Sequence, residues 1–171
     1  FFPAKAMCAH VTSWNKNASI KFRTDMASMC KLGFDIGLKD LKAEELEYCQ
    51  LAVANWKRLQ PVILDGVQYR LVSPYESNHM AVNYVSQDCS KGVVFTYDIY
   101  PRFQEKLMKL KVRGLDPNKM YKVEEINLMP TEESELKEHG KVFSGDYLMK
   151  VGLDVFGFQP TQSHVIELTV E

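Results

Sequence analysis

Three pairs of adjacent carboxylates are the side chains best suited to acid–base chemistry: Glu44–Glu45, Glu124–Glu125 and Glu132–Glu133. Glycoside hydrolysis, for example, needs two carboxylates that face each other across a cleft, one of them with a raised pKa. The first pair begins a predicted helix and the third lies in a polar insertion, so we expect both to be solvated. The second pair interrupts the alternation of a predicted strand, which favours a β-bulge over a catalytic dyad.

Cysteine and histidine side chains are spread singly along the 171 residues. They are Cys8, Cys30, Cys49 and Cys89, and His10, His79, His139 and His164. A zinc site needs such ligands in clusters, and the sequence has no Cys-x-x-Cys pair. We therefore expect no metal and no cofactor, and we interpret the cysteines as buried free thiols. His10 lies between two small apolar residues, Ala9 and Val11, and is expected to be a hydrogen-bonded histidine either of the core or in the second layer of side chains behind a site.

Charge and hydropathy argue against two classes of partner. The net charge is −1 at pH 7 and the isoelectric point is near 6.5, which gives no electrostatic basis for binding nucleic acid or an anionic membrane. No apolar run approaches the roughly 18 residues of a membrane-spanning helix. Nothing in the sequence distinguishes a cytoplasmic, a periplasmic and a secreted location.

Residues 1–65 have the pattern strand, helix, strand, helix. We predict strands over residues 8–13 and 32–38, and helices over residues 18–30 and 41–60. The second helix is amphipathic, with acids in its first turns and bases in its last, and Pro61 is expected to end it. Alternating strands and helices predict parallel strand pairing.

Beyond Gly66 the apolar residues alternate with period two, which is the pattern of half-buried strands. Predicted strands begin near Tyr69, Met80, Val93, Met108, Tyr121 and Ile166. The link over residues 86–92 is rich in turn residues and predicts a hairpin. About seven short strands joined by turns are typical of an antiparallel β-sandwich, so the predicted fold class is α+β.

Five segments, in order, resemble motifs from the C-terminal region of the family 36 glycoside hydrolases, the α-galactosidases. They are Met7–Thr12, Arg23–Ile36, Tyr69–Glu76, Leu110–Val123 and Phe143–Leu153. The first resembles the family's Met-Gly-Ala-His-Val-Ser strand, and the third resembles its Tyr-Arg-Leu-x-Ser-Pro-Phe-Glu. Cys8 and Cys30 stand where the family usually has glycine. The family's Pro-Asn-x-x-Thr-Gly-Arg loop is replaced by residues 14–17.

The resemblance implies a (β/α)₈ barrel followed by an antiparallel β-domain. Residues 1–65 would be the C-terminal end of the catalytic barrel, with strand seven over 8–13 and strand eight over 32–38. Residues 66–171 would be the β-sandwich domain. The family uses a retaining mechanism with two aspartates, and both of their motifs are expected to precede Phe1. The chain is therefore expected to be a non-catalytic, accessory part of an enzyme that hydrolyses terminal α-galactosides.

The same resemblance gives candidate substrate contacts. Barrel active sites gather at the carboxyl ends of the strands, so Ser13, Trp14 and Asn15 would face the sugar in the intact enzyme. Trp14 is interpreted either as a stacking platform for galactose or as ordinary packing. Arg23 and Asp25 form either an ion pair on their helix or part of the substrate site. No catalytic residue and no metal ligand are assigned.

The predicted sandwich is rich in aromatic residues: Tyr69, Tyr75, Tyr84, Phe95, Tyr97, Tyr100, Phe103, Tyr121, Phe143, Tyr147, Phe156 and Phe158. Most of them alternate with polar residues, which favours core packing. The alternative function is a carbohydrate-binding β-sandwich module that uses surface aromatics.

The opening Phe1-Phe2-Pro3 leaves two bulky aromatics at a free end, so we expect the natural protein to be longer. The expected partners are α-galactoside oligosaccharides and the missing N-terminal part of the barrel. Two barrel strands alone would have open edges and an uncovered apolar face. We therefore expect either a homodimer that covers residues 1–40 or collapse of these residues onto the sandwich.

Overall fold

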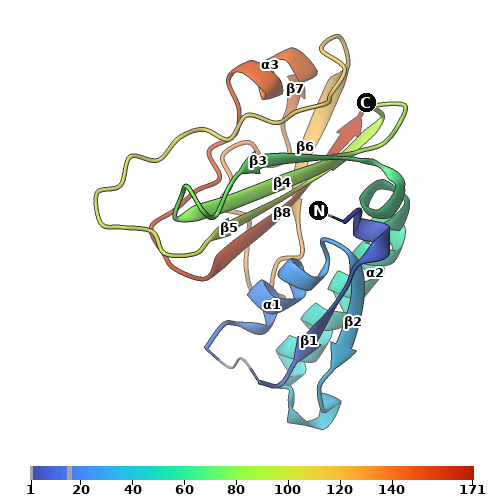
Figure 1. Cartoon of the computed structure of the whole chain (residues 1–171), viewed down its shortest axis with the longest axis vertical. Helices are drawn as coiled ribbons and strands as arrows, with labels where there is room; N and C mark the ends of the chain where they lie inside the picture. The colour runs from blue at the N-terminus through green and yellow to red at the C-terminus, as the bar shows by residue number, and fades with distance from the viewer. Residues whose placement is uncertain (1, 15–16) are drawn as a thin grey trace.

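The N-terminal part of the chain pairs two parallel strands and covers them with two helices (Figure 1). The computed structural model describes residues 2–14 and 17–171. The elements of this part are η1 (Ala4–Ala6), β1 (Cys8–Thr12), α1 (Ile20–Ala27), β2 (Lys31–Asp35), η2 (Leu38–Asp40) and α2 (Ala43–Asp65). Ser19 caps α1, because its hydroxyl accepts the Phe22 N–H at 3.1 Å. In the described residues no helix is both long and apolar enough to cross a membrane.

The long helix α2 continues through Pro61, so the prediction that proline ends it is wrong. Proline inside a helix removes one hydrogen bond and costs about 3 kcal/mol. Val62 and Ile63, which follow directly, are buried in a core shared with the sheet. Burying two such side chains stabilises the fold by about 1.5 to 3 kcal/mol each. Packing of the last turn therefore outweighs the proline, whose own ring is exposed.

The C-terminal part forms one six-stranded antiparallel sheet in the order β3-β4-β5-β8-β6-β7. Its strands are β3 (Val67–Val72), β4 (His79–Val85), β5 (Lys91–Asp98), β6 (Met120–Ile126), β7 (Val142–Ser144) and β8 (Gln162–Val170). The predicted hairpin is confirmed, since β4 and β5 pair in antiparallel register with Val85 opposite Gly92. The α+β fold class is confirmed as well.

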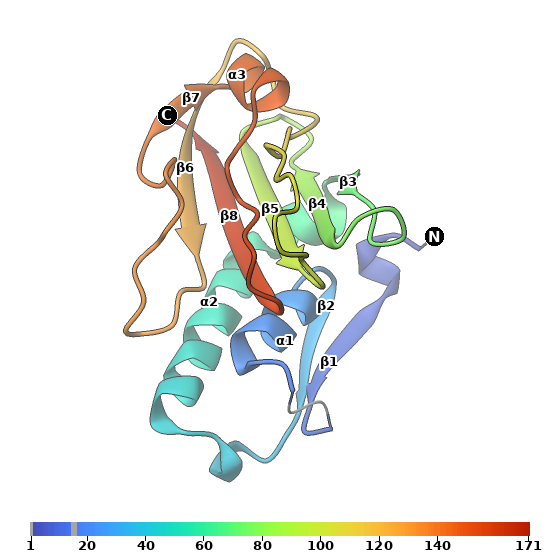
Figure 2. The same ribbon diagram turned by 90° about the vertical axis from the view of Figure 1, so that its left-hand side faces the viewer.

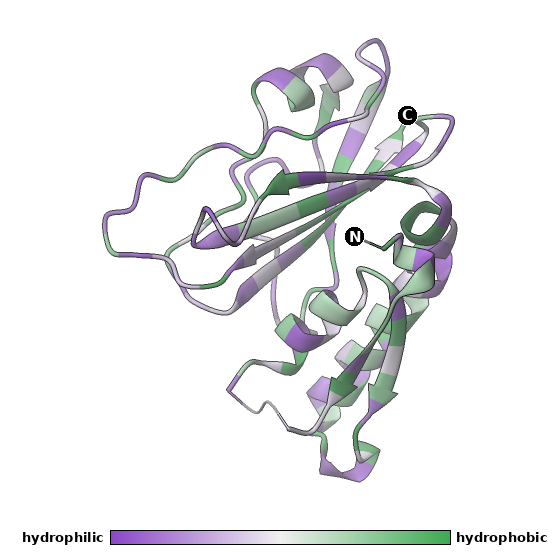
Figure 3. Ribbon diagram, in the orientation of Figure 1, coloured by the Kyte–Doolittle hydropathy of each residue, from purple (hydrophilic) through white to green (hydrophobic). Residues whose placement is uncertain are grey.

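The two faces of the sheet are covered differently. Helices α1 and α2 lie against one face, as Figure 2 shows, and bury Leu59, Val62 and Ile63 against strand residues such as Phe95. The other face is covered by the extended segments that follow β5 and precede β8, and by α3 (Gly145–Lys150). Figure 3 shows apolar residues recurring along α2 and the strands, whereas the long loops are mostly hydrophilic.

The second layer of the sandwich is built mainly from extended segments that are not paired as strands. The strand predicted near Met108 forms only a single bridge, in which Leu110 and Leu153 exchange backbone hydrogen bonds of 2.8 and 3.0 Å. The alternation predicted there holds from Leu110 onward, because Leu110 and Val112 are buried while Lys111 and Arg113 are exposed. Met108, predicted to face the same side as Leu110, is exposed. Burial of apolar side chains therefore holds this layer against the sheet, and hydrogen bonding between paired strands contributes little.

One face of the parallel pair is covered and the other is bare. Val11 is buried with Ile20 and Tyr48 under the two helices. On the opposite face Cys8 and His10 are exposed, so the expectations of a buried Cys8 thiol and a core His10 are wrong. A barrel strand buries both faces, one under helices and one in the barrel interior. In this chain the helices cover one face of the strand pair, and nothing in the described residues covers the other.

The bridge in the second layer depends on a glycine. Gly152 has φ +90°, and an added Cβ would lie 2.5 Å from the carbonyl oxygen of Leu110. Gly140 also has a left-handed φ, of +73°, but its Cβ position is open. We expect Gly152→Ala to lower the free energy of unfolding by about 3 kcal/mol, since steric conflict adds to left-handed strain. The control Gly140→Ala should cost only about 1 kcal/mol. Urea titration measures both, and equal losses would contradict the assigned contact.

Candidate functional site

A cavity of about 330 Å³ opens at the carboxyl ends of β1 and β2. Parallel pairing brings Thr12 and Asp35 to the same edge, so the loops that follow both strands meet there. The cavity is lined by Ser13, Asn17, Ala18, Ser19, Ile20, Arg23, Ile36, Gly37, Asp40, Leu41 and Glu45. Polar groups from two loops and two helices therefore converge at the edge where parallel sheets place their ligands.

Arg23 connects two segments of the chain at the opening of this cavity. Its Nη1 donates to the carbonyl oxygen of Thr12 at 2.6 Å, and its Nε donates to that of Ser19 at 3.4 Å. The last residue of β1 is thus tied to the first turn of α1. The ion pair that the sequence suggested on this helix forms differently, because Asp25 pairs with Lys21 and not with Arg23.

The predicted sugar-contact residues have different positions in the structure. Ser13 lines the cavity. The Trp14 side chain is 85% exposed, so core packing does not hold it in this chain. Asn15 lies outside the described residues. Asn17 and Asp40 also line the cavity and were not predicted from the sequence, although both follow a strand and the same carboxyl-end rule applies to them.

Two carboxylates belong to this cavity, and neither is a buried proton donor. Glu45 Oε2 accepts the Lys42 N–H at 2.8 Å and so caps α2. Asp40 is exposed, and the absence of a side chain at Gly37 leaves room for its Oδ2. A glycosidase acid needs an apolar environment that raises its pKa. The cavity instead presents a guanidinium, hydroxyls, an amide and carboxylates, which suit hydrogen bonding to a polyhydroxylated ligand.

A second polar site surrounds Glu125 on β6. The strand is regular across both glutamates, so the predicted bulge is wrong and Glu125 points inward. Its carboxylate contacts His164 Nδ1 at 2.5 Å and accepts a hydrogen bond from Ser134. Burial acts to raise the pKa of Glu125, but the bonds from His164 and Ser134 outweigh it and hold the pKa below its usual value. This site borders a separate cavity of about 230 Å³.

A third polar site fastens the loops at one end of the sheet. His79 Nδ1 lies 2.6 Å from Asp98 Oδ1, and its Nε2 lies 3.7 Å from Glu105 Oε2. Asp98 also accepts the Gly157 N–H at 2.9 Å. Burial raises the pKa of Asp98, although these partners act in the opposite direction. Over residues 2–14 and 17–171, no group of three or more His, Cys, Asp or Glu side chains could hold a metal ion.

Asp25, fully buried in α1, joins the two parts of the chain. Its carboxylate accepts hydrogen bonds from four side chains: Lys21 at 2.6 Å, Tyr48 at 2.8 Å, Ser163 at 2.8 Å and Asn127 at 3.1 Å. Its backbone carbonyl accepts one from Tyr97 at 2.9 Å. Burial, together with the charge of Asp25, raises the pKa of Tyr48 well above its usual value. Donors from α1, α2, β5 and β8 and from the loop after β6 therefore meet at one residue.

The sequence matches the family model of the glycosyl hydrolase family 36 C-terminal domain over residues 79–168. Among curated proteins, α-galactosidase AgaA of Geobacillus stearothermophilus is 29% identical over 157 residues, which are 89% of this chain and 20% of that protein. Probable α-galactosidase G of Aspergillus terreus is 30% identical over 129 residues, or 72% of this chain and 18% of that protein. The chain thus spans about a fifth of the length of these relatives.

Solved structures give the same result. The α-galactosidase AgaB of Geobacillus stearothermophilus superposes with a TM-score of 0.85 and 27% identity, covering 99% of this chain and 22% of that one. A variant of AgaA in complex with stachyose has a TM-score of 0.83 and 26% identity, with 99% and 22% of the two chains covered. The similarity includes the parallel strands as well as the sheet, because nearly the whole chain is aligned.

The role of Asp25 can be tested by removing its carboxylate. Asp25→Ala leaves four buried or half-buried donors without their acceptor, and we expect the free energy of unfolding to fall by about 3 to 5 kcal/mol. Asp146→Ala is the control, because it removes a partly exposed i,i+4 pair with Lys150 and should cost under about 0.5 kcal/mol. Chemical denaturation followed by circular dichroism measures both. Similar losses for the two variants would contradict a central role for Asp25.

Proposed function

Because the chain belongs to glycosyl hydrolase family 36, we propose that it is the C-terminal portion of an α-galactosidase that hydrolyses terminal α-galactosides. Residues 1–65 would complete a catalytic barrel, and residues 66–171 would form the β-domain that braces it. The end of α2 at Asp65 and the start of β3 at Val67 support a boundary between these two parts. The α-galactosidase relatives, which align over both parts, support the substrate class.

The geometry of β1 and β2 is the observation that carries this proposal. The strands are parallel, their helices cover one face, and the opposite face with Cys8 and His10 is bare. A barrel fragment has this arrangement, since the bare face belongs to the barrel interior. The ring of His10 also lies over Gly33, where an added Cβ would come within 2.4 Å of it. The missing barrel polypeptide is the proposed partner of this face.

The substrate side of the proposal rests on the cavity at the strand ends. Ser13 lines it, and the exposed ring of Trp14 is free to stack on a sugar. Asn15 stays a prediction from the sequence. Variants of the relative AgaA have been crystallised with raffinose and with stachyose. An α-galactoside oligosaccharide is accordingly the ligand that we propose for the assembled site.

We expect the chain alone to be non-catalytic. Glu45 caps a helix and Asp40 is exposed, so the cavity supplies no pair of carboxylates with different environments. Incubation with p-nitrophenyl α-galactoside should release p-nitrophenol only at the rate of a blank without protein. AgaA of Geobacillus stearothermophilus, assayed in parallel, is the positive control. Turnover that coelutes with the folded chain would contradict this prediction.

A second function, sugar binding by the β-domain, is favoured by four exposed aromatics: Tyr75, Tyr100, Phe103 and Phe158. The loops that carry them leave the same end of the sheet, where the end of β5 lies opposite the starts of both β4 and β8. The other aromatics of the domain are buried or half-buried, as the core interpretation predicts. Exposed rings grouped on neighbouring loops can serve as stacking platforms for sugars.

Calorimetric titration with raffinose tests this second function. Phe103 is 90% exposed, and we expect Phe103→Ala to weaken binding about two- to twelvefold, because one stacking ring contributes about 0.5 to 1.5 kcal/mol. Phe2→Ala is a matched control, since Phe2 is also exposed and lies on the N-terminal segment. Absence of heat from the unmodified chain at millimolar sugar would rule out the binding-module function.

A further inference from the structure

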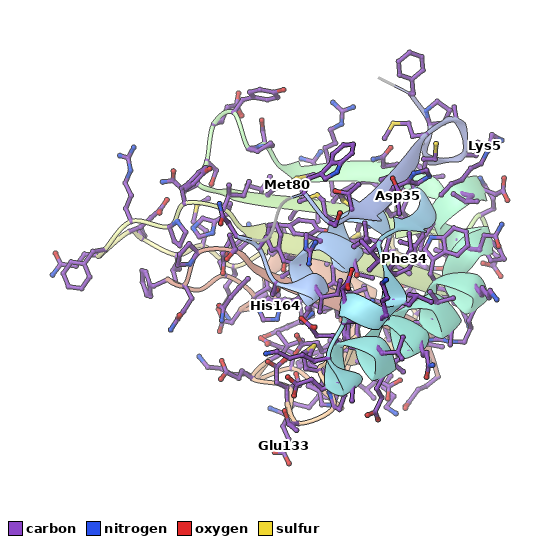
Figure 4. The ribbon with its side chains drawn as sticks, turned by 90° about the horizontal axis from the view of Figure 1, so that it is seen from below. Lys5, Phe34, Asp35, Met80, Glu133 and His164 are labelled. Atoms are coloured by element: carbon purple, nitrogen blue, oxygen red, sulfur yellow. The ribbon has the colours of Figure 1, made fainter. Side chains whose placement is uncertain are left out.

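His79, the first residue of β4, is buried among the loops that leave one end of the sheet. Its ring is tilted against that of Phe156, and the two ring centroids are 4.7 Å apart. The loop after β5 and the turn between β3 and β4 project from this end of the sheet, away from α2, as Figure 4 shows. The proposed hydrolytic function makes no use of this buried titratable ring.

Both ring nitrogens of His79 face carboxylates. Nδ1 lies 2.6 Å from Asp98 Oδ1 at the end of β5, and Nε2 lies 3.7 Å from Glu105 Oε2 on the loop after β5. In the described part of the chain, Nε2 is buried without a hydrogen-bond partner. An ionised carboxylate only accepts hydrogen bonds, so a neutral ring would turn the Nε2 lone pair toward the charge of Glu105. The protonated ring directs one N–H group at each carboxylate, and this is the form that the geometry suits.

The other charged groups at this contact are Arg102 and His164. The backbone N–H of Arg102 donates to Glu105 Oε2 at 3.0 Å, and its guanidinium charge also acts on Glu105. His164 lies on β8, which pairs with β5, and its positive charge when protonated acts on Asp98. Asp98 is only 1% exposed, and burial raises its pKa. An ionised Asp98 therefore depends on a cation beside it, and His79 is the one in direct contact.

The same cluster connects three loops. Glu105 accepts hydrogen bonds of 3.2 Å from the amide of Asn78, which ties the turn before β4 to the loop after β5. Asp98 Oδ2 accepts the Gly157 N–H at 2.9 Å, and the Asp98 carbonyl oxygen accepts the Thr161 N–H at 2.7 Å, which ties in the segment before β8. These three loops carry exposed rings: Tyr75, Tyr100, Phe103 and Phe158.

We propose that His79 is a proton-dependent positioning residue, which holds these three loops in one arrangement as the imidazolium and loosens them when it loses its proton. The held form is the protonated one, so the contact is complete in weakly acidic solution and is lost as the pH rises through the range, near about pH 6.5, where histidine ordinarily titrates. The hydrogen bonds from Asn78 and Gly157 persist, so the loops become mobile while the sheet stays folded. This inference depends on neither proposed function.

Hydrogen exchange of the whole chain, followed by mass spectrometry and corrected for the intrinsic rate at each pH, tests this proposal. In the unmodified chain, amides of residues 73–78, 99–109 and 156–161 should be about tenfold less protected at about pH 8.5 than at about pH 5.5. Amides of β5 are the internal reference and should change far less. Unchanged protection in the three loops, or a loss of equal size throughout the chain, would overturn the proposal.

Two substitutions identify the titrating group. Glu105→Gln replaces a carboxylate that only accepts with an amide that also donates, so it suits both forms of the His79 ring. The Glu105 side chain is 22% exposed, and we expect this variant to fold and to keep the loops protected at both pH values. His79→Gln removes the titratable ring and should also abolish the pH dependence. The matched control is His10→Gln, which replaces an exposed histidine of β1 and should leave the pH dependence intact.

Two results with these variants would contradict the assignment. A pH dependence that survives in both Glu105→Gln and His79→Gln would mean that another group titrates. Loss of loop protection at both pH values in Glu105→Gln would mean that the carboxylate of Glu105 has a structural role that is independent of the His79 proton.

Discussion

The fold depends on one buried carboxylate. Asp25 is fully buried, and an ion in that position is tolerable only if it is paired and hydrogen-bonded. Lys21 supplies the opposite charge. Further hydrogen-bond donors come from Tyr48 in α2, from Asn127 in the loop after β6, and from Ser163 in β8. The α1 helix can therefore occupy only one position relative to the sheet. Apolar packing alone would allow it to slide.

This constraint explains how a parallel strand pair stays folded beside an antiparallel sheet. Helices α1 and α2 have apolar residues on two sides, one under β1 and β2 and one against the sheet. A second ionic contact, with Arg58 donating to Glu167 at 2.5 and 2.7 Å, fixes α2 to β8. The helices thus join the N-terminal residues to the sheet, whereas the expected cover of the bare face, by a second copy or by collapse onto the sandwich, stays a prediction. The bare face of the strand pair stays open to the proposed barrel partner.

The sequence allowed prediction of features that depend on local pattern. The β4–β5 hairpin follows from alternation around a turn-rich link, and the parallel pair follows from strand–helix order. The wrong predictions concern positions whose conformation depends on contacts with residues far away in the sequence. Pro61 is tolerated within α2 because Val62 and Ile63 are buried against the sheet. Glu125 points inward because its carboxylate contacts His164 and Ser134. The role of Asp25 has no local signal, since Ser163 lies 138 positions away.

Partners were also harder to predict than elements, and the reason is electrostatic. A net charge of −1 sums over the chain and says nothing about separation in space. Lys109, Lys111 and Arg113 alternate with the buried Leu110 and Val112 and so are exposed along the second layer, whereas Glu132, Glu133 and Glu135 lie on the loop after β6. At physiological ionic strength, salt screens the interaction between exposed charges beyond about 8 Å. Charges that lie farther apart than this act separately, so a near-neutral composition is compatible with local surfaces of strong charge.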